Sequence, residues 1–295
     1  MSKKHPVIAV TGSSGAGTTT VKRAFEHIFF REKINAAVIE GDSFHCLSRM
    51  EFKDAVKKAE AEGNMHFSHF GPQANHFAKL AELFKTYGET GGGKKRYYIH
   101  SDEEAAEHNK RLNTSLNPGE FTPWEDVPAG SDVLFYEGLH GLVKTDDVDV
   151  SQHVDLGIGV VPIVNLEWIQ KIHRDGAERG YSADVIVDTI LRRMPDYVNY
   201  ITPQFSRTDI NFQRVSTVDT SNPFITRDIP TPDESFIVIR FREPKGVDFP
   251  YLLNMIPNSF MSRRNTLVVP GAKMGFAMEL ILAPIIQDMI AGKKK

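Results

Sequence analysis

The sequence predicts an α/β fold, in which a mixed β-sheet is flanked by helices, and three observations lead to this prediction. An apolar run at 7–10 is followed by a glycine-rich stretch and an amphipathic helix. Two further apolar runs, at 36–40 and 133–137, look like strands, and each ends in an acidic residue. Beyond residue 205, short strands alternate with loops before an apolar final helix. Alternating strands and helices are typical of a sheet that helices cover on both faces.

The composition describes an ordinary soluble chain of 295 residues with a net charge of -3. This charge gives no support for a nucleic-acid partner, because such domains are usually strongly basic. The single cysteine, Cys46, excludes an internal disulfide and indicates a reducing compartment. No secretory signal is visible, and the final apolar segment at 276–290 is interrupted by Glu279, Pro284 and Asp288. We therefore expect no membrane partner and a cytoplasmic location.

The strand at 7–10 leads into the stretch that says most about function. That stretch reads Gly12, Ser13, Ser14, Gly15, Ala16, Gly17, Thr18 and Thr19. Its glycines let backbone N–H groups point inward, and the helix predicted at 21–30 adds its positive end, as in a phosphate-binding loop for ATP. Thr19 holds the position whose hydroxyl usually reaches Mg²⁺, whereas Thr18 replaces the usual lysine. The missing charge must then come from elsewhere; the alternative is an ordinary glycine-rich turn.

The second strand, predicted at 36–40, ends beside a group of polar residues. In open α/β sheets ligands bind at the carboxyl ends of the strands, so this tip should lie near the phosphate loop. Asp42 is a candidate general base for a substrate hydroxyl, and His45 and Arg49 are placed to hold an anionic substrate. The alternative, equally compatible with the local sequence, is that Asp42 and Ser43 cap the helix that follows.

The middle of the chain carries fewer signals. A helix is expected at 75–87, followed by a flexible basic turn at 90–96 and an aromatic strand at 97–99. The basic turn could contact a phosphate group, or it could be a solvated hairpin tip. The polar, proline-containing stretch at 102–128 is predicted to be an excursion over the surface.

The apolar strand at 133–137 ends in Glu137. A carboxylate at the end of a strand beside a phosphate loop suits the second half of a nucleotide site, where it would bind Mg²⁺ directly or through water. The alternative is a glutamate that only terminates a buried strand. We favour the magnesium role because of the neighbouring phosphate loop.

After a buried strand at 156–164, two charged helices are predicted at 165–181 and 183–194. At helical spacing, one face of the first helix presents Lys171, Arg174, Asp175 and Arg179. The second helix adds Arg192 and Arg193. A mostly basic hairpin at approximately 165–195 suits a lid that closes over polyphosphate and replaces the missing lysine. The alternative is a solvated charged face.

The C-terminal part, approximately 205–292, is predicted to be an elaboration of the same α/β domain. Strands are expected at 209–218, 236–241 and 267–269, before the terminal helix. Because the chain contains neither an internal repeat nor a clear linker, the prediction is one domain over 1–295.

With these residues in place, the chain resembles the bacterial phosphoribulokinases nearly from end to end. The resemblance is carried by 12–19, 39–45, 136–141, 165–175, 205–214 and 219–224. Those enzymes also lack the phosphate-loop lysine, so Thr18 agrees with the resemblance. It implies a P-loop kinase fold and transfer of the ATP γ-phosphoryl group to the 1-hydroxyl of ribulose 5-phosphate, giving ribulose 1,5-bisphosphate in the Calvin cycle.

The resemblance also implies roles for individual residues. Asp42 resembles the catalytic base, and Glu137 the acid that accompanies Mg²⁺. The residues that match binders of the sugar phosphate are His45, Arg49 and Arg179. The lid residues that match the catalytic set are Lys171, Arg174 and Asp175, of which the two cations would stabilise the phosphoryl group in transfer.

Regulation and assembly are implied by resemblance alone. They comprise activation by NADH, inhibition by AMP and a homo-octamer, with Arg31, Arg240 and Arg263 matching the effector positions. The disulfide switch of the plant-type enzyme is not possible, because Ala16 stands in the loop and Cys46 is the only cysteine. The alternatives are a kinase of the uridine or pantothenate type and a non-catalytic ATP-binding regulator.

Overall fold

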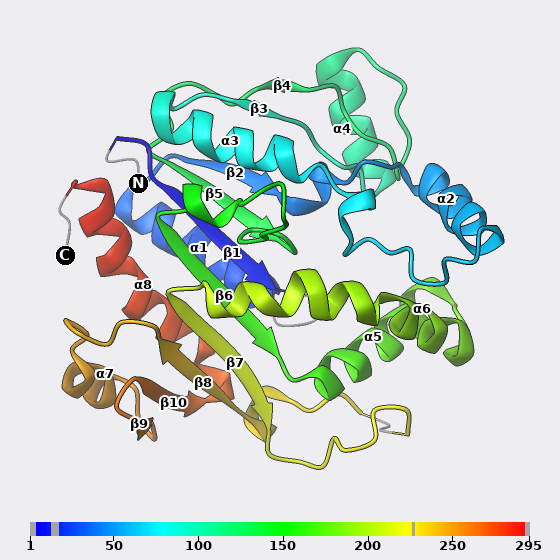
Figure 1. The fold of residues 1–295 in the computed structure, drawn as a ribbon. Coiled ribbons are helices and arrows are strands. Elements are labelled where there is room, and N and C mark those ends of the chain that lie inside the picture. Colours follow the sequence, from blue (N-terminus) through cyan, green and yellow to red (C-terminus); the bar gives the residue numbers. More distant parts are fainter. Residues whose placement is uncertain (1–3, 13–17, 226–227, 293–295) are drawn as a thin grey trace.

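A computed structural model describes residues 4–12, 18–225 and 228–292 (Figure 1). Its main sheet has the strand order β2-β5-β1-β6-β7-β8-β10-β9. The strands of this sheet are β1 (Val7–Gly12), β2 (Ala36–Glu40), β5 (Val133–Gly138), β6 (Leu156–Pro162), β7 (Ile210–Ser216), β8 (Ser235–Phe241), β9 (Phe260–Arg263) and β10 (Thr266–Pro270). The first five in spatial order are parallel, and the last three continue antiparallel. The mixed α/β sheet expected from the sequence is confirmed.

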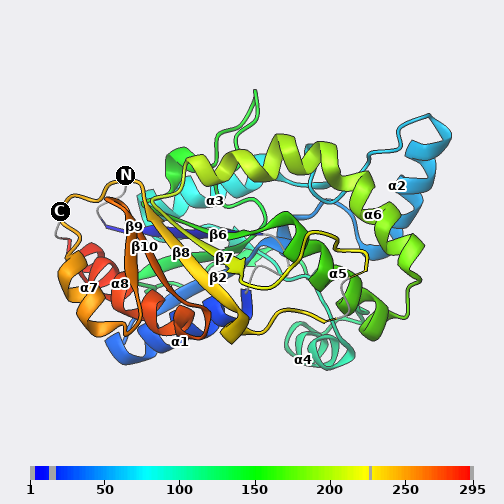
Figure 2. The same cartoon turned by 90° about the horizontal axis from the view of Figure 1, so that it is seen from below.

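The α-helices form two layers around the sheet and a group beyond its strand ends. They are α1 (Thr18–Glu32), α2 (Arg49–Ala61), α3 (Phe77–Thr90), α4 (Asp102–Leu112), α5 (Val164–Arg179), α6 (Ala183–Asp196), α7 (Phe249–Met255) and α8 (Met274–Ile290). Figure 2 shows α1 and α8 on one face and α3 on the other. Past α6, a π-helical turn, η4 (Tyr197–Ile201), and a 3-10 turn, η5 (Thr202–Ser206), run over the same face as α3.

The parallel strands form the buried centre of the molecule. Every residue of β1 is buried, as expected for a strand with helices on both sides. The core on one face joins α1 and α8 to residues such as Ile8 and Phe135, and the core on the other face joins α3 to residues such as Ala9 and Tyr136. Successive side chains of one strand therefore pack into the cores on opposite faces of the sheet. Because β2, β5, β1 and β6 are parallel, their carboxyl ends lie at the same edge of the sheet.

The antiparallel strands have one covered face and one open face. In β8, Ile237 and Ile239 pack toward α8, whereas Phe236 and Arg240 are exposed on the opposite face. This alternation is typical of a half-covered antiparallel sheet. The predicted C-terminal strands are confirmed, and the structure shows that they continue the main sheet. The elements α7 and β9 were not revealed by the sequence.

Part of the predicted surface excursion is helical. The prediction for 102–128 missed α4, which begins after its N-cap Ser101 and ends at Asn113 in the left-handed conformation. The Ser101 hydroxyl accepts a hydrogen bond from the Glu104 N–H, and the first turn is acidic and the last turn basic. These are recognised helix signals, but only Ala105 of this helix is buried, so no apolar stripe marked it.

The predicted aromatic strand at 97–99 is wrong. Strand pairing occurs earlier, where β3 (Lys94–Lys95) pairs with β4 (Glu125–Asp126), and within 97–99 Tyr98 forms only an isolated bridge with Phe121. The expected flexible turn at 90–96 is thus partly a strand.

Among the described residues, no helix is long and apolar enough to cross a membrane.

Candidate active site

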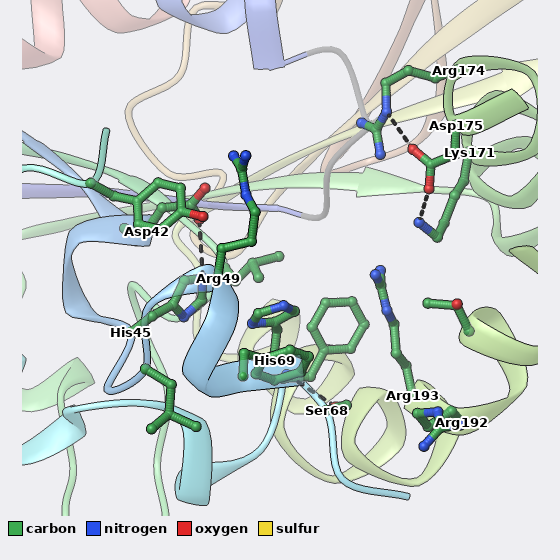
Figure 3. Close-up of a pocket in the computed structure, with 18 of the residues that line it drawn as sticks. Asp42, His45, Arg49, Ser68, His69, Lys171, Arg174, Asp175, Arg192 and Arg193 are labelled. Atoms are coloured by element: carbon green, nitrogen blue, oxygen red, sulfur yellow. Dashed lines mark hydrogen bonds and ion pairs between the residues drawn. The ribbon is translucent and has the colours of Figure 1, made fainter. Parts of the chain in front are cut away.

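A cavity of about 970 Å³ opens at the carboxyl ends of the parallel strands, between α2 on one side and the α5–α6 hairpin on the other. We call it the strand-end cavity. Its lining includes most of the described site residues predicted from the sequence, namely Gly12, Asp42, His45, Arg49, Glu137, Lys171, Arg174, Asp175, Arg192 and Arg193. Figure 3 shows Asp42, His45 and Arg49 on one side and the Lys171 group on the other.

One wall of the strand-end cavity carries Asp42 and Glu137, and it depends on the close approach of two glycines. Gly41 follows β2 and Gly138 ends β5; a Cβ atom on Gly41 would lie 2.8 Å from Gly138 Cα and 2.6 Å from the Tyr136 hydroxyl oxygen. No side chain fits at either position. The glycines therefore let Asp42 and Glu137, one residue away on each strand end, share the mouth of the cavity.

Asp42 is held ionised by its surroundings. Burial alone would raise its pKa, but the hydrogen bond and positive charge of His45, with smaller contributions from His100 and His69, lower the pKa to about 2. Its Oδ1 lies 3.4 Å from His45 Nε2, and 46% of its side chain stays open to the cavity. An accessible, ionised carboxylate is what a base for a hydroxyl group requires.

The helix-capping alternative for Asp42 is wrong. The N-cap of α2 is Ser48, whose side chain accepts from the Glu51 N–H while the Glu51 carboxylate accepts from the Ser48 N–H. Asp42 lies instead in a 3-10 turn, η1 (Gly41–Phe44). Arg49 is the first residue of α2, and its guanidinium points into the cavity in Figure 3.

Arg96 fixes the loop that carries Asp42 and His45. Its Nε donates to the Ser43 carbonyl (2.7 Å) and its Nη2 to the His45 carbonyl (2.5 Å). The guanidinium lies 3.8 Å from the ring centroid of Phe121 and 4.6 Å from that of Trp124. The basic turn at 90–96 was expected either to contact a phosphate group or to be a solvated hairpin tip. For Arg96 both expectations are wrong, because its guanidinium binds backbone carbonyl groups and packs on aromatic rings.

Glu137 pairs in register with Glu40 of β2 and is also affected by the charge of Asp42. Burial, and then the charges of Asp42 and Glu40, raise its pKa to about 7, against a small opposing effect of Lys22. A cation at this point would relieve the repulsion, so the site chemically suits Mg²⁺, which commonly takes one or two carboxylates and completes its shell with water and phosphate. In the described part of the chain, no cluster of three or more His, Cys, Asp or Glu residues could hold a metal alone.

The second wall of the cavity is formed by the charged face of α5. Asp175 accepts from Lys171 and, at 3.1 Å, from the Nε of Arg174, so these three residues do share one helical face. Asp175 is 3% and Lys171 8% exposed. Burial, and then the charge of Arg193, lower the pKa of Lys171 to about 8, although the hydrogen bond and charge of Asp175 oppose this. The solvated-face alternative is wrong for this pair.

The helix α6 is joined by an ion pair to the opposite side of the cavity. Arg192 on α6 donates through Nη2 to Glu60 on α2 (2.5 Å) and to Asp188 on its own helix (3.2 Å). Arg193 lies with its guanidinium carbon 5.1 Å from the Phe70 ring centroid and extends toward Lys171 in Figure 3. The Glu60–Arg192 ion pair thus connects α6 to α2.

Some predicted residues cannot be placed. Ser13, Ser14, Gly15, Ala16 and Gly17 lie outside the described residues, and the side chains of Thr18, Thr19 and Arg179 are also not described. The end of β1, which precedes the phosphate loop, is nevertheless held by hydrogen bonds. Gln204, which is fully buried, accepts from the Thr11 hydroxyl (3.0 Å) and donates to the Leu139 carbonyl (2.8 Å).

The three arginines of the expected effector site lie away from the strand-end cavity. Arg240 and Arg263 pair with the same residue, Thr266, from its two neighbouring strands, so they share one face of the sheet. Arg31 is on α1, which packs on the other face, and it pairs with Glu32 and Glu279. Within one chain, these arginines do not converge.

Comparisons with known proteins agree on one family. The model of the Phosphoribulokinase / Uridine kinase family matches residues 7–221. A phosphoribulokinase of Nitrobacter vulgaris is 60% identical over 295 residues and covers 100% of both chains. A probable phosphoribulokinase of Escherichia coli K12 is 58% identical over 100% of this chain and 99% of its own. The solved structure of a phosphoribulokinase from Rhodobacter spheroides superposes with a TM-score of 0.89 at 52% identity, covering 99% of each chain.

Proposed function

The chain belongs to the phosphoribulokinase / uridine kinase family, and from this premise we propose that it is a phosphoribulokinase. The reaction transfers the γ-phosphoryl group of ATP to the 1-hydroxyl of ribulose 5-phosphate and yields ADP and ribulose 1,5-bisphosphate, a step of the Calvin cycle. One observation carries the proposal beyond the family. The strand-end cavity places an ionised carboxylate and cations on one wall opposite a buried cationic group on the lid.

Asp42 is proposed as the base that accepts the proton of the sugar hydroxyl. Its pKa of about 2 keeps it ionised at neutral pH, and its open side chain can reach a bound hydroxyl. Phosphoryl transfer depends mainly on positioning and charge stabilisation, so a weak but well-placed base is sufficient.

Lys171 and Arg174 are proposed to stabilise the phosphoryl group during transfer. Asp175 fixes both cations on one face of α5, and the low exposure of Lys171 and Asp175 limits the screening of their charges by water. This arrangement supports the idea that lid cations replace the lysine missing at Thr18. ATP itself would lie on the loop at 12–19, at the positive end of α1.

Glu137 and Thr19 are proposed as the protein ligands of Mg²⁺. The bound ion would neutralise charge on the transferring phosphate groups, and the raised pKa of Glu137 supports a cation-binding role.

His45, Arg49 and Arg179 are proposed to bind the phosphate group of the sugar. An acceptor without charge, such as uridine, does not require cations at this end of the cavity. The position of His45 and Arg49 beside Asp42 therefore favours an anionic acceptor over the uridine-type alternative. The coexistence of a base and lid cations favours turnover over a regulator that only binds ATP.

Further features stay proposals. They are a single domain over 1–295, a lid at approximately 165–195, a homo-octamer and control by NADH and AMP. Because Arg31 lies on the opposite side of the sheet from Arg240 and Arg263, an effector site that uses all three would require two copies of the chain.

The proposed function is tested by ADP release from Mg²⁺-ATP. Parallel reactions contain ribulose 5-phosphate, uridine, pantothenate or no acceptor, each with and without NADH or AMP. Release that depends on ribulose 5-phosphate is expected. Release with uridine or pantothenate instead would contradict the substrate, and ATP binding without release for any acceptor would favour the regulator.

A further inference from the structure

A chain of hydrogen bonds determines which ring nitrogen of His45 carries a proton. The Nδ2 of Asn75 lies 2.8 Å from the His69 carbonyl and 2.7 Å from the Gly71 carbonyl. Carbonyl oxygens can only accept, so the amide nitrogen of Asn75 must face them and its oxygen must face the other way. That oxygen lies 2.7 Å from Nδ1 of His45. Nδ1 therefore carries a hydrogen and donates to Asn75.

The other ring nitrogen faces a carboxylate. Nε2 of His45 lies 3.4 Å from Oδ1 of Asp42. If the ring were neutral with its hydrogen on Nδ1, the unprotonated Nε2 would lie 3.4 Å from the ionised carboxylate of Asp42, with no hydrogen between them. Only the imidazolium form has hydrogens on both nitrogens, so only this form satisfies Asn75 and Asp42 together.

Solvent cannot easily substitute for these partners. His45 is 8% and Asn75 7% exposed, and the two residues also form a backbone bridge. The surrounding titratable groups are Asp42, His69, Arg96, His100 and His140. Near neutral pH, His69 and His140 are uncharged, because burial and, next, the charge of His45 lower the pKa of each to about 3. Arg96 is engaged with the His45 carbonyl and not with its ring.

We propose that Asn75 is a positioning residue that holds His45 as an imidazolium and so sets the charge presented to the sugar phosphate. Asn75 does not contact the substrate; it acts through the ring of His45. The identity of the anion rests on the proposed function, but the hydrogen-bond argument does not.

The test uses two variants of nearly equal size, Asn75→Leu and Asn75→Asp. Both lose the two donors of the amide nitrogen, so a purely structural role of Asn75 predicts similar changes in both. The proposal predicts opposite changes in the dependence of kcat/KM for ribulose 5-phosphate on pH. In Asn75→Leu, the decrease of kcat/KM at high pH (the alkaline limb) should move to lower pH. The ring of His45, no longer bound by Asn75, can then become neutral and donate to Asp42 through Nε2.

In Asn75→Asp, a carboxylate would accept from Nδ1 and favour the imidazolium, so the same limb should move to higher pH. Each shift is expected to reach about one pH unit, as for a charge or hydrogen bond gained or lost beside an ionisable group. Shifts in the same direction, or no shift, would overturn the proposal.

A second measurement needs neither a variant's activity nor the substrate. Nitrogen-15 NMR of the wild-type protein with labelled histidine distinguishes the two neutral tautomers and the imidazolium, and His45→Gln assigns the signal. We expect the imidazolium to convert, on raising the pH, to the tautomer with hydrogen on Nδ1. A neutral form with hydrogen on Nε2 would refute the role of Asn75, even if the protein transferred no phosphoryl group to ribulose 5-phosphate.

Discussion

The approach of Gly41 to Gly138 should be sensitive to a single methyl group. In Gly41→Ala, the new Cβ would lie 2.8 Å from Gly138 Cα and 2.6 Å from the Tyr136 hydroxyl oxygen. Non-bonded carbons prefer about 3.5–4.0 Å, so the ends of β2 and β5 must separate by about 1 Å. A rotamer change cannot relieve a clash with a backbone atom. Overpacking of this kind costs about 1–3 kcal/mol of unfolding free energy.

The same displacement should reduce catalysis, because Asp42 follows Gly41 directly. A misplacement of about 1 Å can lower a rate about 100-fold. Urea unfolding and turnover with ribulose 5-phosphate would measure the two effects. The control is Gly275→Ala on α8, whose added Cβ would lie 3.7 Å from its nearest neighbour, Thr20 Cγ2. This control should lower neither the unfolding free energy nor the turnover, because alanine favours a helix at least as well as glycine does. A Gly41→Ala protein as stable and active as this control would refute the reasoning.

Three further predictions concern the walls of the cavity. Arg96→Met should reduce kcat/KM at least about tenfold, because it releases the loop at 43–45. The control Lys94→Met removes an exposed ion pair and should not reduce kcat/KM. Equal kcat/KM values for the two variants would contradict the positioning role of Arg96. Glu60→Gln should raise the KM several-fold by weakening the contact of α6 with α2, whereas Glu62→Gln, at the C-cap of α2, should not. Unchanged kinetics in Glu60→Gln would argue against this contact. The wild type should be more stable than Asp42→Asn by about 1 kcal/mol of unfolding free energy. This is less than the full pKa shift of Asp42 would give, because its side chain is 46% exposed and solvent screens its charge. Its folded pKa is depressed from 3.8 to about 2, so this advantage should be complete above pH 3.8 and disappear as the pH falls through about 2; urea unfolding of both proteins from pH 5 to 2 measures it.

The parts of the site that could be predicted from the sequence are those encoded locally. The strand at 36–40 has the bounds predicted for it, because an apolar run ending at Gly41 and Asp42 carries its own signal. The grouping of Lys171, Arg174 and Asp175 followed from helical spacing alone. The rule that ligands bind at the carboxyl ends of parallel strands predicted that the tip after 36–40 lies near the phosphate loop, and Asp42 lines the same cavity as Gly12, the first residue of that loop.

The parts that were missed depend on partners distant in sequence. Asn75 is 30 residues from His45, and Arg96 is 53 residues from Ser43. Arg96 binds backbone carbonyl groups, which every residue possesses, so no side-chain pattern indicates the contact. Gln204 similarly joins two strand ends through main-chain atoms and the Thr11 hydroxyl. Such contacts arise only when the tertiary fold brings the segments together.

The central claim is that the strand-end cavity transfers a phosphoryl group to a sugar hydroxyl with Asp42 as the base. The most direct test follows radiolabel from γ-labelled ATP into ribulose 1,5-bisphosphate for the wild type and Asp42→Asn, with ATP binding measured in parallel. Labelled product is expected from the wild type, and the variant should retain ATP binding while its rate falls by about 10²–10⁴-fold. Transfer by Asp42→Asn at nearly the wild-type rate would contradict the central claim.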